Sequence, residues 1–208
     1  MSSTCFPGHV KVYGDGVPRS WTQAREECDV WCHDMATVVT APYFWELGLS
    51  LFPTVAAYLE TDEPRLYSMN AFWARPSAAA PMRDLQTFHR DHDDERFVAL
   101  FVYGTDVLEP ADGPHRFVRG SHTFREDDGN NDSMNVYGPA GTAFLADTRG
   151  LHMGMKPTRG ERLILWARWC VSERPWSYDQ DRLAPVTAVG DRYRVDARTR
   201  ELTKLVLA

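Results

Sequence analysis

The stretch Leu85-Gln-Thr-Phe-His-Arg-Asp91 stands shortly before a run of apolar residues, 97–103 (FVALFVY). The run is typical of a buried strand, because β-branched and aromatic residues predominate in it. In an extended segment, residues two apart project to the same face, so His89 and Asp91 can offer an imidazole nitrogen and a carboxylate oxygen to one metal ion. The stretch therefore predicts a metal site beside the beginning of a strand. His92 and Asp94 form a second, overlapping pair of the same kind.

A site of this kind needs a third ligand from a distant part of the chain, and His152 is the candidate. It follows the predicted strand 142–147 and precedes the strand that begins at Arg162. Two histidines and one carboxylate suit Fe(II) and leave three coordination positions open for a chelating cosubstrate and O₂. Ligand types alone do not choose the metal, so zinc held by the same three residues stays an alternative.

Short apolar segments separated by turns make up the middle of the chain, which predicts a mainly β fold, a sandwich or jelly roll. The predicted strands are 66–74, 97–103, 116–119, 142–147 and 162–171. Upstream, a capping box at Ser20 and apolar steps of three and four residues predict a helix over 20–35. A second helix is predicted over 43–60 with a break after Leu51, because Pro53 interrupts it. We expect these helices to cover one face of the barrel.

The strand 162–171 carries two arginines on one face. Alternation places Arg162, Trp166 and Arg168 together, with bulky apolar residues on the other face. An arginine that enters an apolar strand needs an anionic partner, and its planar fork suits a carboxylate such as the distal one of 2-oxoglutarate. Arg168 and Trp166 are the candidates for contacting a polar or anionic group of a substrate.

Three further segments have weaker signals. Residues 125–135 are polar and aperiodic, which predicts a mobile excursion near one barrel end and a candidate lid. Residues 191–204 alternate weakly and predict a terminal hairpin, and 77–81 predict a loop. No repeat or second domain is visible, so residues 1–208 are expected to form one domain, with a helical part at 20–60 and a β core at about 66–171.

Composition excludes several classes of function. The chain has 208 residues, a formal net charge of −6 and a pI of about 5.6, which disfavours binding to nucleic acid or to an anionic membrane surface. It has no apolar run of about 20 residues and begins without a signal-peptide pattern, so a cytoplasmic location is expected. The four cysteines are too sparse for a disulfide framework and are expected to be reduced, packed thiols.

The chain resembles the phytanoyl-CoA dioxygenase-like branch of the Fe(II)/2-oxoglutarate-dependent oxygenases over about residues 66–171. The resemblance runs through 85–91 and 100–107 and through the Gly-Pro…Gly-Ser-His element of 113–122. It closes with 141–147, His152 and Arg162.

This resemblance implies a double-stranded β-helix, which is a cupin-like jelly roll with flanking helices. It also implies that His89, Asp91 and His152 bind Fe(II) and that Arg162 binds the distal carboxylate of 2-oxoglutarate. Further candidates for contacts with the cosubstrate or substrate are Gln86, Thr142, Ser68, Asn70 and Tyr103. His115 and His122 are expected to be structural, and His92 to lie on the substrate side rather than to bind the metal.

The resemblance implies an oxygenase that consumes O₂ and 2-oxoglutarate and releases succinate and CO₂. Retention of Asp91 favours hydroxylation, while desaturation, epoxidation and ring rearrangement stay open. The short chain favours a small polar metabolite or natural-product intermediate as substrate. Two alternatives stay open: a non-catalytic jelly-roll protein that binds a metal or ligand, and a cupin-like metalloenzyme that does not use 2-oxoglutarate. Substrate identity and oligomeric state are not readable from the sequence.

Overall fold

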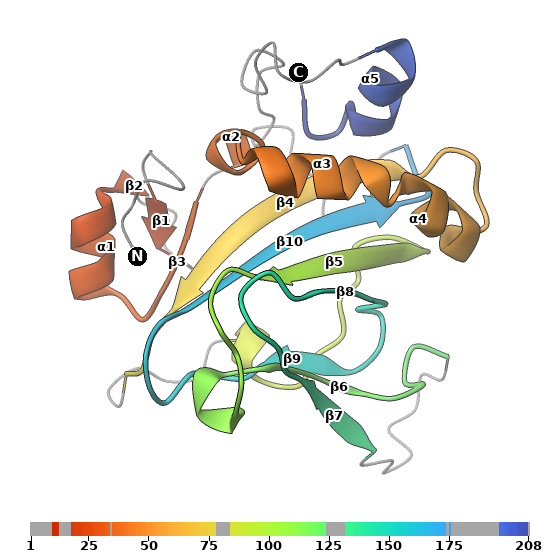
Figure 1. The fold of residues 1–208 in the computed structure, drawn as a ribbon. Helices are drawn as coiled ribbons and strands as arrows, with labels where there is room; N and C mark the ends of the chain where they lie inside the picture. The colour runs from red at the N-terminus through yellow and green to blue at the C-terminus, as the bar shows by residue number, and fades with distance from the viewer. Residues whose placement is uncertain are drawn as a thin grey trace.

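The computed structural model describes residues 10–12, 18–33, 35–77, 84–123, 132–173, 175 and 196–207. Two antiparallel sheets face each other in this part of the chain (Figure 1). The larger sheet has the order β2-β1-β3-β4-β10-β5-β8, and the smaller has the order β7-β6-β9. Their strands are β1 (Val10–Val12), β2 (Pro18–Arg19), β3 (Val30–His33), β4 (Arg65–Ala74), β5 (Phe97–Tyr103), β6 (His115–Val118), β7 (Ser133–Val136), β8 (Ala143–Ala146), β9 (His152–Gly154) and β10 (Arg162–Cys170).

Helices cover the outer face of the larger sheet. They are α2 (Met35–Val38), α3 (Pro42–Ser50), α4 (Phe52–Leu59) and α5 (Ala197–Thr203), which Figure 1 shows above β4 and β10. The predicted break in the second helix is confirmed, because α3 ends at Ser50 and α4 has Pro53 in its first turn. The main apolar core lies between these helices and the sheet, with Trp45 and Trp169 among its fully buried side chains.

Strand β10 separates this core from the barrel interior. Leu163, Leu165 and Trp169 face the helices, whereas Ile164 and Trp166 belong to the inner cluster with Phe101. The predicted alternation along 162–171 is therefore confirmed. Because β10 lies between β4 and β5, its inner face is at the centre of the larger sheet.

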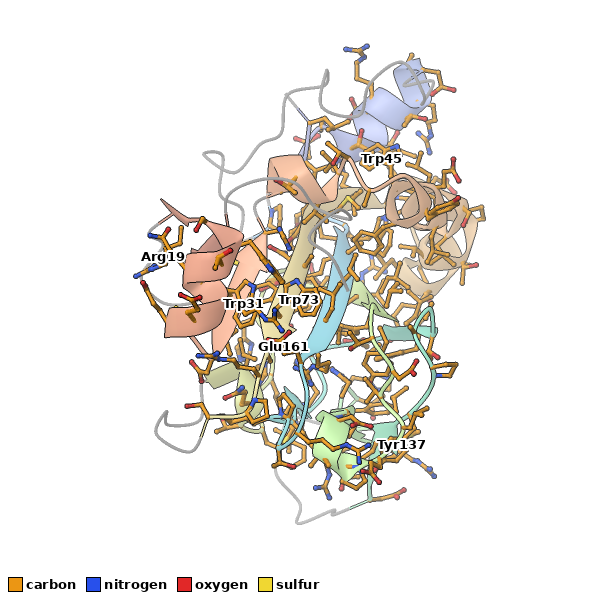
Figure 2. All side chains as sticks on the ribbon, turned by 60° about the vertical axis from the view of Figure 1, so that its left-hand side comes forward. Arg19, Trp31, Trp45, Trp73, Tyr137 and Glu161 are labelled. Carbon is orange, nitrogen blue, oxygen red and sulfur yellow. The ribbon has the colours of Figure 1, made fainter. Side chains whose placement is uncertain are left out.

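The prediction of one helix over 20–35 is wrong beyond Glu27. Helix α1 (Trp21–Glu27) begins with the expected Ser20–Gln23 capping box, but Cys28 is extended and 30–33 form β3. This strand pairs with β4, and Trp31 stacks on Trp73 with ring centroids 6.3 Å apart (Figure 2). Cross-strand packing of large aromatic rings overrides the helical period of the apolar residues.

The C-terminal prediction is also wrong where it can be compared. Residues 197–203 form α5 rather than a hairpin strand, because Asp196 accepts a hydrogen bond from Thr199 N at 2.7 Å and caps the helix. Of the predicted excursion 125–135, residues 133–135 belong to β7. Residues 125–131 and 191–195, and 78–81 of the predicted loop, lie outside the described residues.

None of the described helices is both long and apolar enough to cross a membrane. The three described cysteines, Cys28, Cys32 and Cys170, form no disulfide, and Cys170 is buried.

Candidate metal centre

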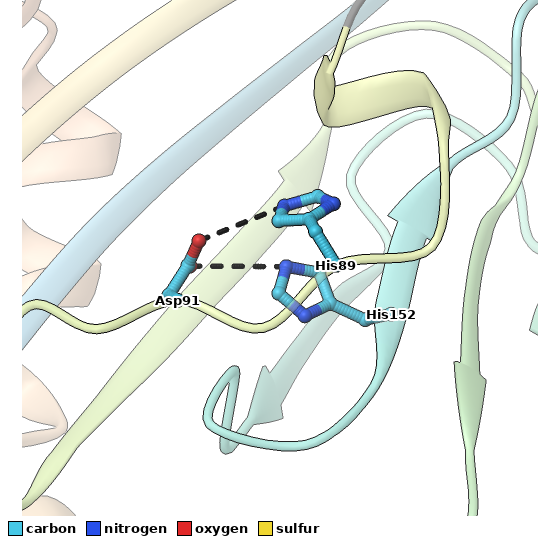
Figure 3. A group of neighbouring side chains, drawn as sticks. All are labelled: His89, Asp91 and His152. Atoms are coloured by element: carbon cyan, nitrogen blue, oxygen red, sulfur yellow. Dashed lines mark ion pairs between the residues drawn. The ribbon is translucent and has the colours of Figure 1, made fainter. Parts of the chain in front are cut away.

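His89, Asp91 and His152 come together at the junction of the two sheets (Figure 3). His89 and His152 form an isolated antiparallel bridge, in which each backbone N donates to the other's O at 2.9 Å. The backbone N of Asp91 donates to Thr148 O at 2.9 Å, so the turn before β9 holds this residue as well. Three backbone hydrogen bonds thus hold together two segments that are about 60 residues apart in the sequence.

The ligand atoms of the three residues surround one point. His89 Nε2 lies 3.6 Å from Asp91 Oδ1, and His152 Nε2 lies 3.7 Å from Asp91 Oδ2. All three candidate ligand atoms are within 4.8 Å of one another. Neighbouring donors on one octahedral ion, each about 2.1 Å from it, are about 3 Å apart. Small side-chain movements therefore suffice to close this group around an ion.

Both imidazoles have the tautomer that a metal ligand needs. His89 Nδ1 lies 2.8 Å from Thr87 O, and His152 Nδ1 lies 2.9 Å from Gly150 O. A carbonyl oxygen only accepts, so each Nδ1 carries the proton and each Nε2 keeps its lone pair. Burial lowers the pKa of His152 to about 4, which leaves this imidazole neutral near pH 7.

Arg168 contacts the carboxylate of the group. Its Nη2 donates to Asp91 Oδ2 at 3.0 Å, and its Nη1 donates to Asp93 Oδ2 at 2.5 Å. Burial is the largest single influence and would raise the pKa of Asp91, but the charge of Arg168, together with His152, His89 and a hydrogen bond from Thr148, leaves this pKa below its usual value. Asp91 is therefore ionised near pH 7 and available as a ligand.

The overlapping pair His92 and Asp94 does not join the group. His92 is exposed, whereas Asp94 is buried and accepts hydrogen bonds from Val171 N at 3.1 Å and Ser172 N at 2.9 Å. Asp94 thus fixes the chain just after β10. His92 lines neither of the two cavities beside the histidines, and its contact with a substrate stays a prediction.

Arg162 lies in a cavity beside this group and is 3% exposed. Its Nη1 donates to Gly113 O and to Met155 O, the latter at 2.9 Å. No carboxylate forms an ion pair with it among the described residues, and burial lowers its pKa to about 10. The pKa of Arg168 shifts in the opposite direction, because its carboxylate partners outweigh the effect of burial and raise this pKa. The cavity is lined by residues including His89, His115, His152, Arg162, Trp166 and Arg168.

Four other predicted site residues have different surroundings. Tyr103 is buried, and its hydroxyl donates to Val136 O at 2.8 Å and accepts from His115 N at 2.9 Å. Asn70 donates to Ser68 Oγ at 2.6 Å on the inner face of β4. Gln86 is fully buried three residues before His89. Thr142 lies against Gly138 in a turn, and none of these four lines the cavity.

The position of His115 differs from the expectation of a structural turn residue. His115 begins β6, is 2% exposed, and stacks on His152 with ring centroids 5.5 Å apart. Its Nε2 has no hydrogen-bond partner among the described residues, and burial holds its pKa well below the usual value. The alternation of His115 and Phe117 on one strand face was the available signal.

No protein-family model matches this chain, and no curated protein matches it significantly in sequence. Solved structures do match. AviO1 from Streptomyces viridochromogenes Tue57 has a TM-score of 0.55 and 19% identity, over 84% of this chain and 77% of that chain. The fold of this chain is similar to that of AviO1 and to that of a second solved structure, HygX. Apo HygX from Streptomyces hygroscopicus has a TM-score of 0.52 and 17% identity, over 68% of this chain and 72% of that chain.

HygX with nickel and 2-oxoglutarate bound also matches, with a TM-score of 0.50 and 19% identity over 76% of this chain and 74% of that chain. These similarities confirm the predicted fold class, a jelly roll with flanking helices.

Proposed function

We propose that this protein is a non-haem Fe(II)- and 2-oxoglutarate-dependent dioxygenase of the phytanoyl-CoA dioxygenase-like kind. In the proposed reaction, substrate C–H, O₂ and 2-oxoglutarate give substrate C–OH, succinate and CO₂. One observation carries the proposal: the two histidines of a His-Asp-His group line the same cavity as a buried arginine that has no acidic partner among the described residues.

The donor set fits an open Fe(II) site. His89 and His152 present Nε2 lone pairs, Asp91 presents a charged oxygen, and the described residues bring no fourth histidine, cysteine or carboxylate into the group. Three protein donors leave three positions for other ligands on an octahedral ion. Bound there, iron would supply the redox chemistry that activates O₂. HygX, which has this fold, binds nickel and 2-oxoglutarate in one of its structures.

Arg162 would bind the distal carboxylate of 2-oxoglutarate. Its Nη1 is held by two backbone carbonyls, so the guanidinium is oriented before any ligand arrives. An anion at this position would offset the cost of burying the charge, which nothing acidic in the described chain does. Gln86 and Thr142 remain predicted cosubstrate contacts, with Gln86 the closer to His89 along the chain.

The proposed substrate is a small polar metabolite or natural-product intermediate. A cavity of about 420 Å³ reaches His115 and His152 between α4, β8 and the turn after β6, and its volume suits a small molecule. A HygX structure holds hygromycin B together with nickel and 2-oxoglutarate. Hydroxylation is proposed because the Asp91 carboxylate would occupy a coordination position. Substrate contacts of Trp166, Asn70 and Tyr103, and the single domain over 1–208, stay predictions.

Anaerobic titration tests the proposal. Apo-protein receives Fe(II) and then 2-oxoglutarate, and a visible charge-transfer band is expected in the wild type. The band should disappear in His152→Ala and need far more 2-oxoglutarate in Arg162→Ala. Iron-loaded wild type without a band would refute the proposal.

The two alternatives predict other results. A non-catalytic metal-binding jelly roll would hold its ion in a closed site, but a structural site normally has a fourth protein ligand, which the described residues do not supply. A zinc- or manganese-dependent cupin-like enzyme would have no use for Arg162 in its buried position. Metal content of the purified protein distinguishes the first, and dependence of turnover on 2-oxoglutarate distinguishes the second.

A further inference from the structure

Arg168 bridges the metal group to the protein interior. It lies on the inner face of β10, opposite Ala99 of β5 and Ser68 of β4, and its side chain is 18% exposed. Its two terminal nitrogens contact different carboxylates, Asp91 and Asp93. These stand two apart in the segment after His89, so one planar fork spans both.

Asp93 is itself fixed by a second buried group. Tyr67 Oη donates to Asp93 Oδ2 at 2.6 Å, and Tyr67 is 4% exposed. The sequence of contacts runs from Tyr67 on β4 through Asp93 and Arg168 to Asp91. Each partner is held by buried neighbours, so a movement of Arg168 away from them would break several hydrogen bonds in the interior. The position of Asp91 Oδ2 is therefore set by the core of the barrel.

The contact separates the roles of the two oxygens of Asp91. Oδ2 accepts the hydrogen bond from Arg168 and lies 3.7 Å from His152 Nε2, whereas Oδ1 lies 3.6 Å from His89 Nε2 and accepts no hydrogen bond from Arg168. A carboxylate can bind a metal with one oxygen or with both. We propose that Arg168 is a positioning residue that keeps Asp91 a one-oxygen ligand, bound through Oδ1. This proposal rests on the proposed function, because it assigns a part in the same metal site.

The count of coordination positions shows why this matters. With Asp91 bound through one oxygen, three positions remain, of which a chelating 2-oxoglutarate takes two and leaves one for O₂. With both oxygens bound, only two positions remain and none is left for O₂ once the cosubstrate is in place. Arg168 thus preserves the position that the proposed reaction requires. Arg168→Lys keeps the charge but loses the fork, so the two properties can be separated.

Cobalt(II) is the probe, because its visible spectrum reports the ligand set and the coordination geometry without turnover. In wild-type protein we expect a Co(II) spectrum that shifts when 2-oxoglutarate is added. In Arg168→Gln the spectrum should differ before 2-oxoglutarate is added, and the Kd for Co(II) should rise about 10- to 100-fold, as for other partners of metal ligands. In Arg168→Lys the retained charge should restore most of the metal affinity but not the spectrum.

Arg65→Gln is the matched control. Arg65 is a second buried arginine on β4, paired with Glu63, Glu173 and Glu201 away from the metal group. This variant should lose stability but keep the wild-type Co(II) spectrum, which separates positioning from general destabilisation. A folded Arg168→Gln with wild-type spectrum and Co(II) affinity would overturn the proposal, and if that variant does not fold, the same result in Arg168→Lys would do so. Wild-type protein that binds no Co(II) or 2-oxoglutarate refutes the proposed function instead.

Discussion

His89 and His152 hold each other through their backbones, since each amide nitrogen donates to the other's carbonyl oxygen at 2.9 Å. The imidazoles are consequently paired before a metal is bound, with ring centroids 4.3 Å apart. Metal binding to such a group costs little ordering of the chain, because the backbone of both ligands is already fixed. The remaining support comes from the turn at 147–150, whose carbonyls hold Asp91 and His152.

Tyr58→Phe tests the contact between the helix layer and this turn. Tyr58 Oη on α4 donates to Asp147 Oδ2 at 2.7 Å, and Asp147 also pairs with Arg149. Loss of the hydrogen bond should cost about 1 kcal/mol in the free energy of unfolding and raise the Kd for metal a few-fold. Urea unfolding and metal titration measure both. Tyr43→Phe on α3, where the side chain is 85% exposed, should change neither.

Gly113→Ala tests how Arg162 is held. Gly113 has φ +73°, and a Cβ there would lie 2.5 Å from Met155 O, which accepts a hydrogen bond from Arg162. We expect the Kd for 2-oxoglutarate to rise about tenfold while the metal Kd stays unchanged, because only the arginine is displaced. Gly160→Ala has a similar φ of +62° but open space around the new Cβ, so it should cost only backbone strain. Equal 2-oxoglutarate affinity in both variants would contradict this account.

Asp91→Asn and Asp94→Asn should have opposite effects, although both aspartates follow a histidine by two residues. The first should abolish tight metal binding and leave the fold intact. The second should weaken the hydrogen bonds from Val171 N and Ser172 N and lower the unfolding free energy by about 1–3 kcal/mol, with metal affinity of the folded protein unchanged. Loss of metal binding in Asp94→Asn with normal stability would reverse the assignment.

The metal-free protein should lose stability as the pH falls from about 6.5 toward 4. His152 has a folded pKa of about 4, so over this range the unfolded state binds the proton and the folded state does not. The unfolding free energy is thus about 3 kcal/mol higher above the pKa of His152 in the unfolded state than at low pH. Buried His115 acts in the same direction. Urea unfolding at pH 7.5 and 4.5 measures this difference. His152→Phe should show a smaller pH dependence.

The sequence predicts those parts of the fold in which apolar residues recur with a clear local period and no distant strand pairing competes with that period. Strand β10 is one of these, since its alternation correctly divides Arg162 and Arg168 from Leu163 and Trp169. Residues 30–33 are the opposite case. Their apolar spacing also fits a helix, and pairing with the distant strands β1 and β4, including the packing of Trp31 on Trp73, makes the strand favourable.

The candidate site also has parts that the sequence predicts and parts that it does not. Side-chain types locate His89, Asp91 and His152, but the carbonyl oxygens of Thr87 and Gly150 that fix the imidazoles are backbone atoms and have no sequence signal. The pairing of Arg168 with Asp91 and Asp93 depends on how the segment after His89 returns to β10. Such a contact follows from tertiary structure and not from spacing along the chain.

Under the proposed function, the different partners of Arg162 and Arg168 would also influence the order in which ligands enter. Arg168 is shared between Asp91 and Asp93, so these three side chains carry a formal net charge of −1, and Arg162 carries +1. A dianionic cosubstrate arriving first would meet the net negative charge of the three side chains, whereas a divalent ion makes the cavity net positive. Once both have bound, the formal charges of the ion, the cosubstrate, the three side chains and Arg162 sum to zero. Under the proposed function, these charges would favour entry of the metal first and would reach electroneutrality once 2-oxoglutarate is bound.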